Sequence, residues 1–294
     1  MITVGLGTCG LGNGAQQVFE TLGRQLKGRA DVTLKRVGCF GFCAQEPLVM
    51  LYLPQRPVLL FKSFQAKDVD RFLEVLDSPQ TDGKLLKRAF ARIETWDFKT
   101  SRFEFGRGFA SVPLWHELPF FQGQHKVVLR DCGFVDPEAI EDYLAVGGYQ
   151  ALAKALHEHR PQDVIEIVTS AKLRGRGGAG FPTGKKWALM RQQQSAEKYV
   201  ICNADEGDPG AYMNRNEIES DPHMLLEGLA IGAYAMGARN GIVYLRAQYP
   251  LAVERLSKAI QDARDWGLLG EGILGSDFSF DVELVRGAGA FVCG

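Results

Sequence analysis

The chain has 294 residues, of which 46% are hydrophobic and 23% charged. This composition excludes a disordered polymer and leaves room for two domains of roughly 100–200 residues each. Lys and Arg total 34 against 35 Asp and Glu, a balance that argues against a nucleic-acid partner. The six cysteines are too thinly spread for a disulfide framework and no signal peptide is recognised, so we expect a cytoplasmic protein.

Residues 1–80 are predicted to form a small α/β domain. The expected strands are 2–6, 32–37, 48–53 and 58–64, and the expected helices are 15–27 and 66–76. The two prolines in 54–57 favour a hairpin between the last two strands. The resulting order β-α-β-β-β-α indicates a thioredoxin-like fold.

Residues 81–125 are less regular and are interpreted as a linker. The segment is rich in aromatic rings, namely Trp96, Phe98, Phe103, Phe105, Phe109, Trp115, Phe120 and Phe121. A solvated linker would not carry so many large apolar side chains, so we expect it to pack against a neighbouring domain.

Residues 126–294 are predicted to form a larger α/β domain. Expected strands are 126–129, 198–202, 241–245 and 280–285, and expected helices are 136–144, 149–157, 161–171, 220–237 and 250–265. Strands that alternate with helices imply a mostly parallel sheet covered on both faces.

A glycine-rich loop dominates the segment 173–187 (LRGRGGAGFPTGKKW). It satisfies G-x-G-x-x-G, but the residues before it are predicted to be helical, whereas a Rossmann loop follows a strand. Lys185 and Lys186 open the next helix, where cations oppose the helix dipole unless an anion binds there. The loop therefore predicts a phosphate site, and a glycine-rich surface turn with solvated charges is the alternative.

An acidic turn follows the strand expected at 198–202. Asn203, Asp205, Glu206 and Asp208 would project at the carboxyl end of this strand, where open α/β sheets bind ligands. Carboxylates suit ribose or ribityl hydroxyls, which are donors. An ordinary solvated turn and a magnesium site are the alternatives.

Four segments together resemble the flavin-bearing subunit of respiratory NADH dehydrogenases and of soluble NAD-linked hydrogenases and formate dehydrogenases. They are 136–152 (DPEAIEDYLAVGGYQAL), 173–187, 202–209 (CNADEGDP) and 287–294 (GAGAFVCG). The resemblance covers residues 115–294. It implies a Rossmann-like FMN-binding domain at 126–294, with hydride transfer from NADH to the flavin and release of electrons one at a time.

The resemblance also implies roles for individual residues. Flavin-binding positions match Gly175, Arg176, Gly177, Gly178, Lys186, Asn203, Asp205, Glu206 and Gly294. NADH-binding positions match Phe181 and Asp208. Asp208 stands where the respiratory subunits have Glu, and Phe291 stands where they have Tyr. Both departures resemble the soluble hydrogenase branch.

The cysteines of residues 1–80 resemble part of another module. Cys39 and Cys43 form a C-x3-C turn which, with Cys9, is similar to the thioredoxin-like ferredoxin that accompanies this flavin subunit and holds a 2Fe–2S cluster on four thiolates. One thiolate is missing here. Either a substitute or partner-supplied ligand completes the cluster, or the domain is a degenerate scaffold that has lost it.

The function implied is an NADH dehydrogenase module that passes electrons through FMN between NAD(H) and the iron–sulfur subunits of a larger complex, itself cytoplasmic or peripheral to a membrane. In this family the chain continues past 294 into a region with a 4Fe–4S cluster, and no C-x2-C-x2-C pattern occurs here. We therefore expect domain 126–294 to be incomplete and that cluster to belong to a missing part or a partner. The alternatives are a flavin-free Rossmann dehydrogenase and a non-catalytic or partial assembly subunit.

Overall fold

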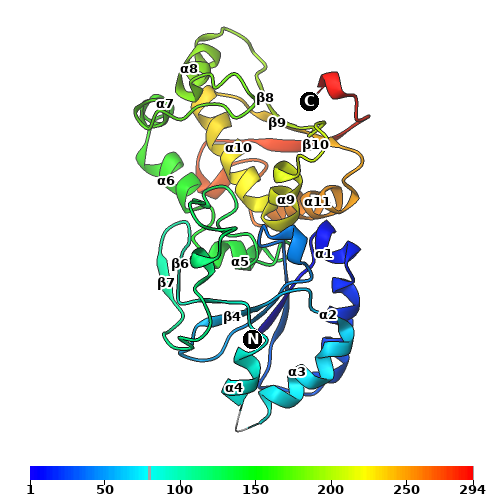
Figure 1. Cartoon of the computed structure of the whole chain (residues 1–294). Helices are drawn as coiled ribbons and strands as arrows, with labels where there is room; N and C mark the ends of the chain where they lie inside the picture. Colours follow the sequence, from blue (N-terminus) through cyan, green and yellow to red (C-terminus); the bar gives the residue numbers. More distant parts are fainter. Residues whose placement is uncertain (79–80, 294) are drawn as a thin grey trace. The chain divides into compact units, whose positions relative to one another are not determined.

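The computed structural model describes residues 1–78 and 81–293, and the chain divides into two compact units (Figure 1). The first comprises residues 1–142 together with Glu219–Asp221, and the second comprises Tyr143–Ile218 and the chain from Pro222 onward. The expected boundaries at 80 and 126 are not those of the structure, because the segment between them supplies secondary structure to the first unit.

A five-stranded mixed sheet forms the centre of the first unit, in the order β2-β1-β3-β4-β5. Its strands are β1 (Ile2–Gly5), β2 (Leu34–Val37), β3 (Val49–Leu51), β4 (Val58–Phe61) and β5 (Ala91–Ile93). β1 and β2 are parallel, and the other neighbouring pairs are antiparallel. The expected hairpin of β3 and β4 is confirmed.

Helices and short 3-10 turns join these strands. They are α1 (Thr8–Gly12), α2 (Ala15–Gln25), η1 (Cys43–Gln45), η2 (Ala66–Asp68), α3 (Val69–Leu76) and α4 (Thr81–Leu86). η3 (Trp115–Glu117) and α5 (Ile140–Ala145) follow the last strand, and α5 continues past residue 142 into the second unit. The β-α-β-β-β-α order expected for the first eighty residues is thus observed.

The sheet buries a hydrophobic core on each of its faces. Successive residues of a strand point to opposite faces, so Leu59 and Phe61 pack with α2 and α3, whereas Val58 and Leu60 pack against aromatic side chains. Both faces of β3 and β4 are therefore apolar, and the two strands appear in the sequence as continuous hydrophobic runs.

The aromatic segment 81–125 packs onto the sheet rather than linking two domains. β5 pairs with β4, and β6 (Thr95–Asp97) and β7 (Arg102–Glu104) form a separate hairpin. Trp96 and Phe121 are buried, and the ring of Trp96 lies 5.5 Å from that of Phe40. The expected packing against a neighbour is confirmed.

The second unit contains a three-stranded parallel sheet in the order β10-β9-β8, which confirms the expected parallel arrangement (Figure 1). Its strands are β8 (Tyr199–Ala204), β9 (Asn240–Arg246) and β10 (Asp281–Gly287). Its remaining elements are α6 (Gln150–Glu158), α7 (Pro161–Ser170), α8 (Thr183–Gln192), α9 (Met213–Ser220), α10 (Pro222–Met236), α11 (Pro250–Asp265), η4 (Ile273–Gly275) and η5 (Phe291–Cys293). α10 contacts α6, α7, α8, β8 and β9.

Only one face of this sheet is well covered within the described ranges 1–78 and 81–293. Val243 and Leu245 are fully buried on the face against which α10 and α11 pack. On the other face, Tyr199 and Ile201 of the edge strand β8 are 46% and 65% exposed. The expectation of helices on both faces is therefore not met here.

Two predicted elements differ from the structure. Residues 126–129 form bends and turns instead of a strand, and Arg130 Nε donates to the Val127 carbonyl across that turn. The helix expected at 136–144 begins only at Ile140, because the Asp136 carboxylate accepts the Glu138 N–H at 2.9 Å and holds a turn there. Among the described residues, no helix is long and apolar enough to cross a membrane.

Candidate functional site

The glycine loop connects α7 to α8 as a closed turn. The N–H of Gly175 donates to the Phe181 carbonyl at 2.9 Å, and the N–H of Thr183 donates to the Leu173 carbonyl at 2.9 Å. The loop thus follows a helix and opens another, as expected, and differs from the strand–loop–helix of the Rossmann fingerprint.

The tip of this loop presents open backbone. A Cβ added to Gly177 or Gly178 would meet no atom within 4 Å, and Gly178 has φ +101°, which L side chains rarely adopt. The Arg176 guanidinium donates to the Arg174 carbonyl at 2.9 Å. A ligand could therefore approach the peptide groups of the tip without obstruction from side chains.

The start of α8 has the properties of an anion site. Pro182 precedes the helix without a side-chain cap. The Thr183 N–H is taken by the Leu173 carbonyl, which leaves the N–H groups of Gly184 and Lys185 as the donors of the first turn. Lys185 and Lys186 are exposed in the first turn, and Lys185 Nζ lies 5.8 Å from the centre of the Phe181 ring. Donors, helix dipole and cations at one place favour a phosphate.

The acidic turn contains a buried carboxylate in need of donors. Asp205 follows β8 and is 3% exposed, and neither of its carboxylate oxygens has a hydrogen-bond partner among the described residues. Its N–H donates to Oδ1 of Asn203 at 3.1 Å. Since buried polar groups are nearly always paired, a ligand that supplies hydroxyl or N–H donors would satisfy Asp205.

Glu206 is held firmly beside it. Its carboxylate accepts the N–H of Asn214 at 3.0 Å and of Arg215 at 3.3 Å, at the start of α9. Its carbonyl accepts from Arg246 at 2.6 Å, and the Tyr249 hydroxyl lies 3.4 Å from its carboxylate. Sequence reasoning missed Arg246 and Tyr249, although Arg246 ends β9 at the same carboxyl edge of the sheet.

Two further titratable groups lie close to this turn. Burial, assisted by the charge of Glu206, raises the pKa of Glu217 to about 7. Burial and the charge of Glu217 likewise raise the pKa of Cys202 to about 11. Both shifts favour the protonated, neutral form of these groups, as expected for acids that are buried beside other acidic groups.

The remaining predicted residues are Asp208 in the acidic turn, the C-terminal Gly294 and the three N-terminal cysteines. Asp208 is exposed at the end of the acidic turn, and a Cβ on Gly207 would lie 3.3 Å from the Phe291 ring. Gly294 lies outside the described residues. Cys39 and Cys43 are brought together with their Sγ atoms 3.7 Å apart, but in the described part of the chain no three metal-ligating side chains gather, Cys9 included.

The second unit thus combines an open glycine loop at a helix start with acidic groups at the carboxyl edge of a parallel sheet, an arrangement that is typical of phosphate and nucleotide sites. Residues 168–294 match the family described as the Nuo51 FMN-binding domain.

Curated relatives agree with this assignment. The chain is 57% identical over 171 residues to the NADP-reducing hydrogenase subunit HndC of Solidesulfovibrio fructosivorans, covering 58% of this chain and 34% of that protein. It is 50% identical over 168 residues to an NADH-quinone oxidoreductase subunit of Rhizobium meliloti (57% and 40%), and 48% identical over 136 residues to the NAD-reducing hydrogenase HoxS subunit alpha of Cupriavidus necator (46% and 23%). The chain therefore spans less than half the length of these relatives.

Proposed function

We propose that the second unit is an FMN-binding module that exchanges hydride with NAD(H) and passes electrons to iron–sulfur subunits of a larger redox complex. The observation that carries the proposal is the buried Asp205 carboxylate, which has no donor among the described residues and lies in a segment that matches the FMN-binding domain model. FMN, when bound, supplies both two-electron hydride chemistry and one-electron transfer.

The phosphate end of FMN fits the glycine loop. Open backbone at Gly177 and Gly178, the uncapped start of α8 and the ammonium of Lys186 together provide donors and positive charge. Gly175 and Arg176 shape the loop by hydrogen bonds to backbone carbonyls. These residues would bind and orient the phosphate and take no part in the redox chemistry.

The sugar-alcohol chain and ring of FMN fit the acidic turn. Asp205 would accept hydrogen bonds from ligand donors, and Asn203, which accepts the Asp205 N–H, would fix the position of that carboxylate. Glu206 is held by two backbone N–H groups and keeps the turn rigid. No protein side chain is required as a general base.

The nicotinamide nucleotide would contact Phe181 and Asp208. Phe181 is 45% exposed and can provide a flat apolar surface for a ring. Asp208 is exposed and can accept from ribose hydroxyls.

We also assign the first unit to the thioredoxin-like type and the second to the Rossmann-like type. The sparse cysteines support a reducing compartment such as the cytoplasm.

The test is FMN titration of the flavin-free chain, followed by flavin fluorescence. Asp205→Asn is expected to weaken binding at least tenfold, because an amide is a poorer acceptor for ligand hydroxyls. The matched variant Asp208→Asn, at an exposed position of the same turn, should leave FMN binding unchanged and weaken NADH binding. A chain indifferent to FMN would reject the proposal.

A second measurement separates the alternatives. The FMN-loaded chain should oxidise NADH with ferricyanide as an artificial acceptor. NADH oxidation in the absence of flavin would favour a flavin-free dehydrogenase, whereas FMN binding without NADH oxidation would favour a non-catalytic assembly subunit.

A further inference from the structure

The first unit contains a pair of cysteines that the proposed flavin chemistry does not use. Cys39 and Cys43 lie at the two ends of one short turn with their Sγ atoms 3.7 Å apart, and no disulfide joins them. Cys39 is 2% exposed, whereas Cys43 is partly exposed. One sulfur is therefore accessible to a small reagent, and the other lies directly behind it.

The surroundings hold Cys39 in a fixed position. The N–H of Gly41 donates to Cys39 Sγ at 3.3 Å, and the Cys39 N–H donates to the Ser220 hydroxyl at 3.1 Å. A Cβ on Gly38 would lie 2.2 Å from Ser220, so only glycine allows this close approach. The turn is thus anchored on the side of Cys39.

A cation lies against the same turn. Lys126 Nζ is 4.0 Å from the centre of the Phe40 ring and donates to the Phe40 carbonyl. A Cβ on Gly41, which has φ +92°, would be only 3.3 Å from Lys126 Nζ. The hydrogen bond with Cys43, burial and the charge of Glu46 raise the pKa of Cys39, so the buried sulfur is held as a thiol behind the more accessible Cys43.

These residues do not fit the 2Fe–2S cluster implied by the resemblance. Such a cluster requires four protein ligands, usually thiolates. Across residues 1–78 and 81–293, no group of three or more Cys, His, Asp or Glu side chains is placed to hold a metal. Two sulfurs are brought together in this turn, which is the number that a disulfide requires.

We propose that Cys39 and Cys43 form a reversible dithiol–disulfide site whose co-reactant is a small-molecule disulfide. The Cys43 thiolate attacks one sulfur of that disulfide and releases the first small thiolate, which takes up the Cys43 proton. The Cys39 thiolate then attacks Cys43 Sγ and releases the second, which takes up the Cys39 proton. The protein loses two electrons and two protons, and the co-reactant becomes two thiols.

The test uses the full chain equilibrated anaerobically with mixtures of reduced and oxidised glutathione, then alkylated and digested with trypsin. The segment between Arg36 and Lys62 holds both cysteines and no other, so its mass reports the pair directly. As glutathione disulfide increases, two alkylation sites should disappear in one transition and the peptide should lose two hydrogen atoms. Dithiothreitol should restore both sites.

Matched variants define the order of events. Cys39→Ser should stop at a stable mixed disulfide of Cys43 with glutathione, whereas Cys43→Ser should leave the buried Cys39 largely unmodified. Cys132→Ser and Cys202→Ser should give the same glutathione titration as the parent chain. Persistence of both thiols at all glutathione ratios would overturn the proposal, as would stoichiometric iron and acid-labile sulfide that disappear in Cys39→Ser.

Discussion

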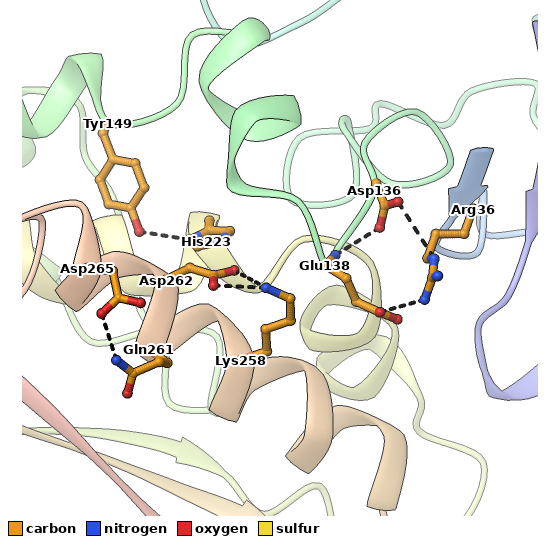
Figure 2. A network of polar contacts seen from close by, with 9 residues as sticks. All are labelled: Arg36, Asp136, Glu138, Tyr149, His223, Lys258, Gln261, Asp262 and Asp265. Carbon is orange, nitrogen blue, oxygen red and sulfur yellow. Dashed lines mark hydrogen bonds and ion pairs between the residues drawn. The ribbon is translucent and has the colours of Figure 1, made fainter. Parts of the chain in front are cut away.

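The hydroxyl of Tyr149 lies 3.0 Å from Nδ1 of His223, which is 1% exposed at the start of α10 (Figure 2). Burial lowers the pKa of His223 to about 4, with a smaller opposing effect from Asp262 and a reinforcing one from Lys258. The folded chain therefore holds this imidazole neutral, and its second nitrogen has no partner among the described residues.

The first prediction is a loss of stability in acid. His223 has a folded pKa of about 4 against an ordinary value of 6.5, so the unfolded chain binds the proton more readily. Neutral His223 therefore contributes fully to the free energy of unfolding above pH 6.5. This contribution falls as the pH drops towards 4, by about 3 kcal/mol in total. His223→Asn should remove this dependence, measured as the difference in urea unfolding free energy between variant and parent across that range.

Tyr149→Phe is the control for this prediction. It removes the partner of Nδ1 and should lower stability by about 1 kcal/mol at every pH, but it keeps the imidazole and so keeps the acid dependence. If the unfolding free energy of His223→Asn depended on pH as steeply as that of the parent, His223 would not be the source of the acid dependence.

The second prediction is that replacing Asp205 raises the stability of the flavin-free chain and lowers its affinity for FMN. Asp205→Asn replaces a buried carboxylate, whose oxygens have no partner among the described residues, with a neutral group, so the flavin-free chain should gain about 1–2 kcal/mol in unfolding free energy. The same change should weaken FMN binding. Thermal melting with and without FMN measures both effects, and a loss of stability without FMN would mean that Asp205 has a partner in solution.

The third prediction separates two roles of the loop glycines: a backbone conformation that favours glycine, and the access of the FMN phosphate to the peptide groups. Gly178→Ala should lower stability by about 1 kcal/mol because its φ is +101°, while Gly177→Ala, without a positive φ, should not. Both should weaken FMN binding, since each adds a methyl group where the backbone meets the phosphate. Gly228→Ala, in α10 with open space around its Cβ, should bind FMN normally.

The fourth prediction tests a contact inside the first unit. Thr8 donates to Glu219 through its hydroxyl at 2.5 Å and its N–H at 2.8 Å. A double-mutant cycle with Thr8→Ala and Glu219→Gln should give a coupling energy of about 1 kcal/mol, because one charge-assisted bond is lost. Thr21→Ala, which affects only a local bond to Arg24, should change stability by less than about 0.5 kcal/mol. Strict additivity in the cycle would show that the contact has no energetic role.

Much of the fold could be predicted because local patterns set it. The apolar runs of β3 and β4, the stripe of α3 and the Pro-started α11 each determine their element within a few residues. The position of 81–125 could not be predicted, because the pairing of β5 with β4 depends on distant residues. A turn stabilised by Asp136, Glu138 and Arg36 likewise replaced the expected start of a helix (Figure 2).

The candidate site shows the same division. The glycine loop and the acidic turn are visible in the sequence because backbone access and strand ends leave local signatures. The groups that hold Glu206 come from α9 and from the residues after β9, and only folding brings them to it. The pairing of Cys39 with Cys43 is predictable from spacing, but the absence of a third metal ligand beside them, among the residues that the structure describes, is not.

The inclusion of Glu219–Asp221 in the first unit has a consequence for the order in which this chain can fold. During synthesis, residues 1–142 emerge first, yet the acceptors of Thr8 and of the Cys39 N–H are made only after the whole segment 143–218. Early folding of the N-terminal part would therefore leave that surface unfinished until the ribosome reaches Asp221. Completion of the first unit is tied to translation of about half of the second.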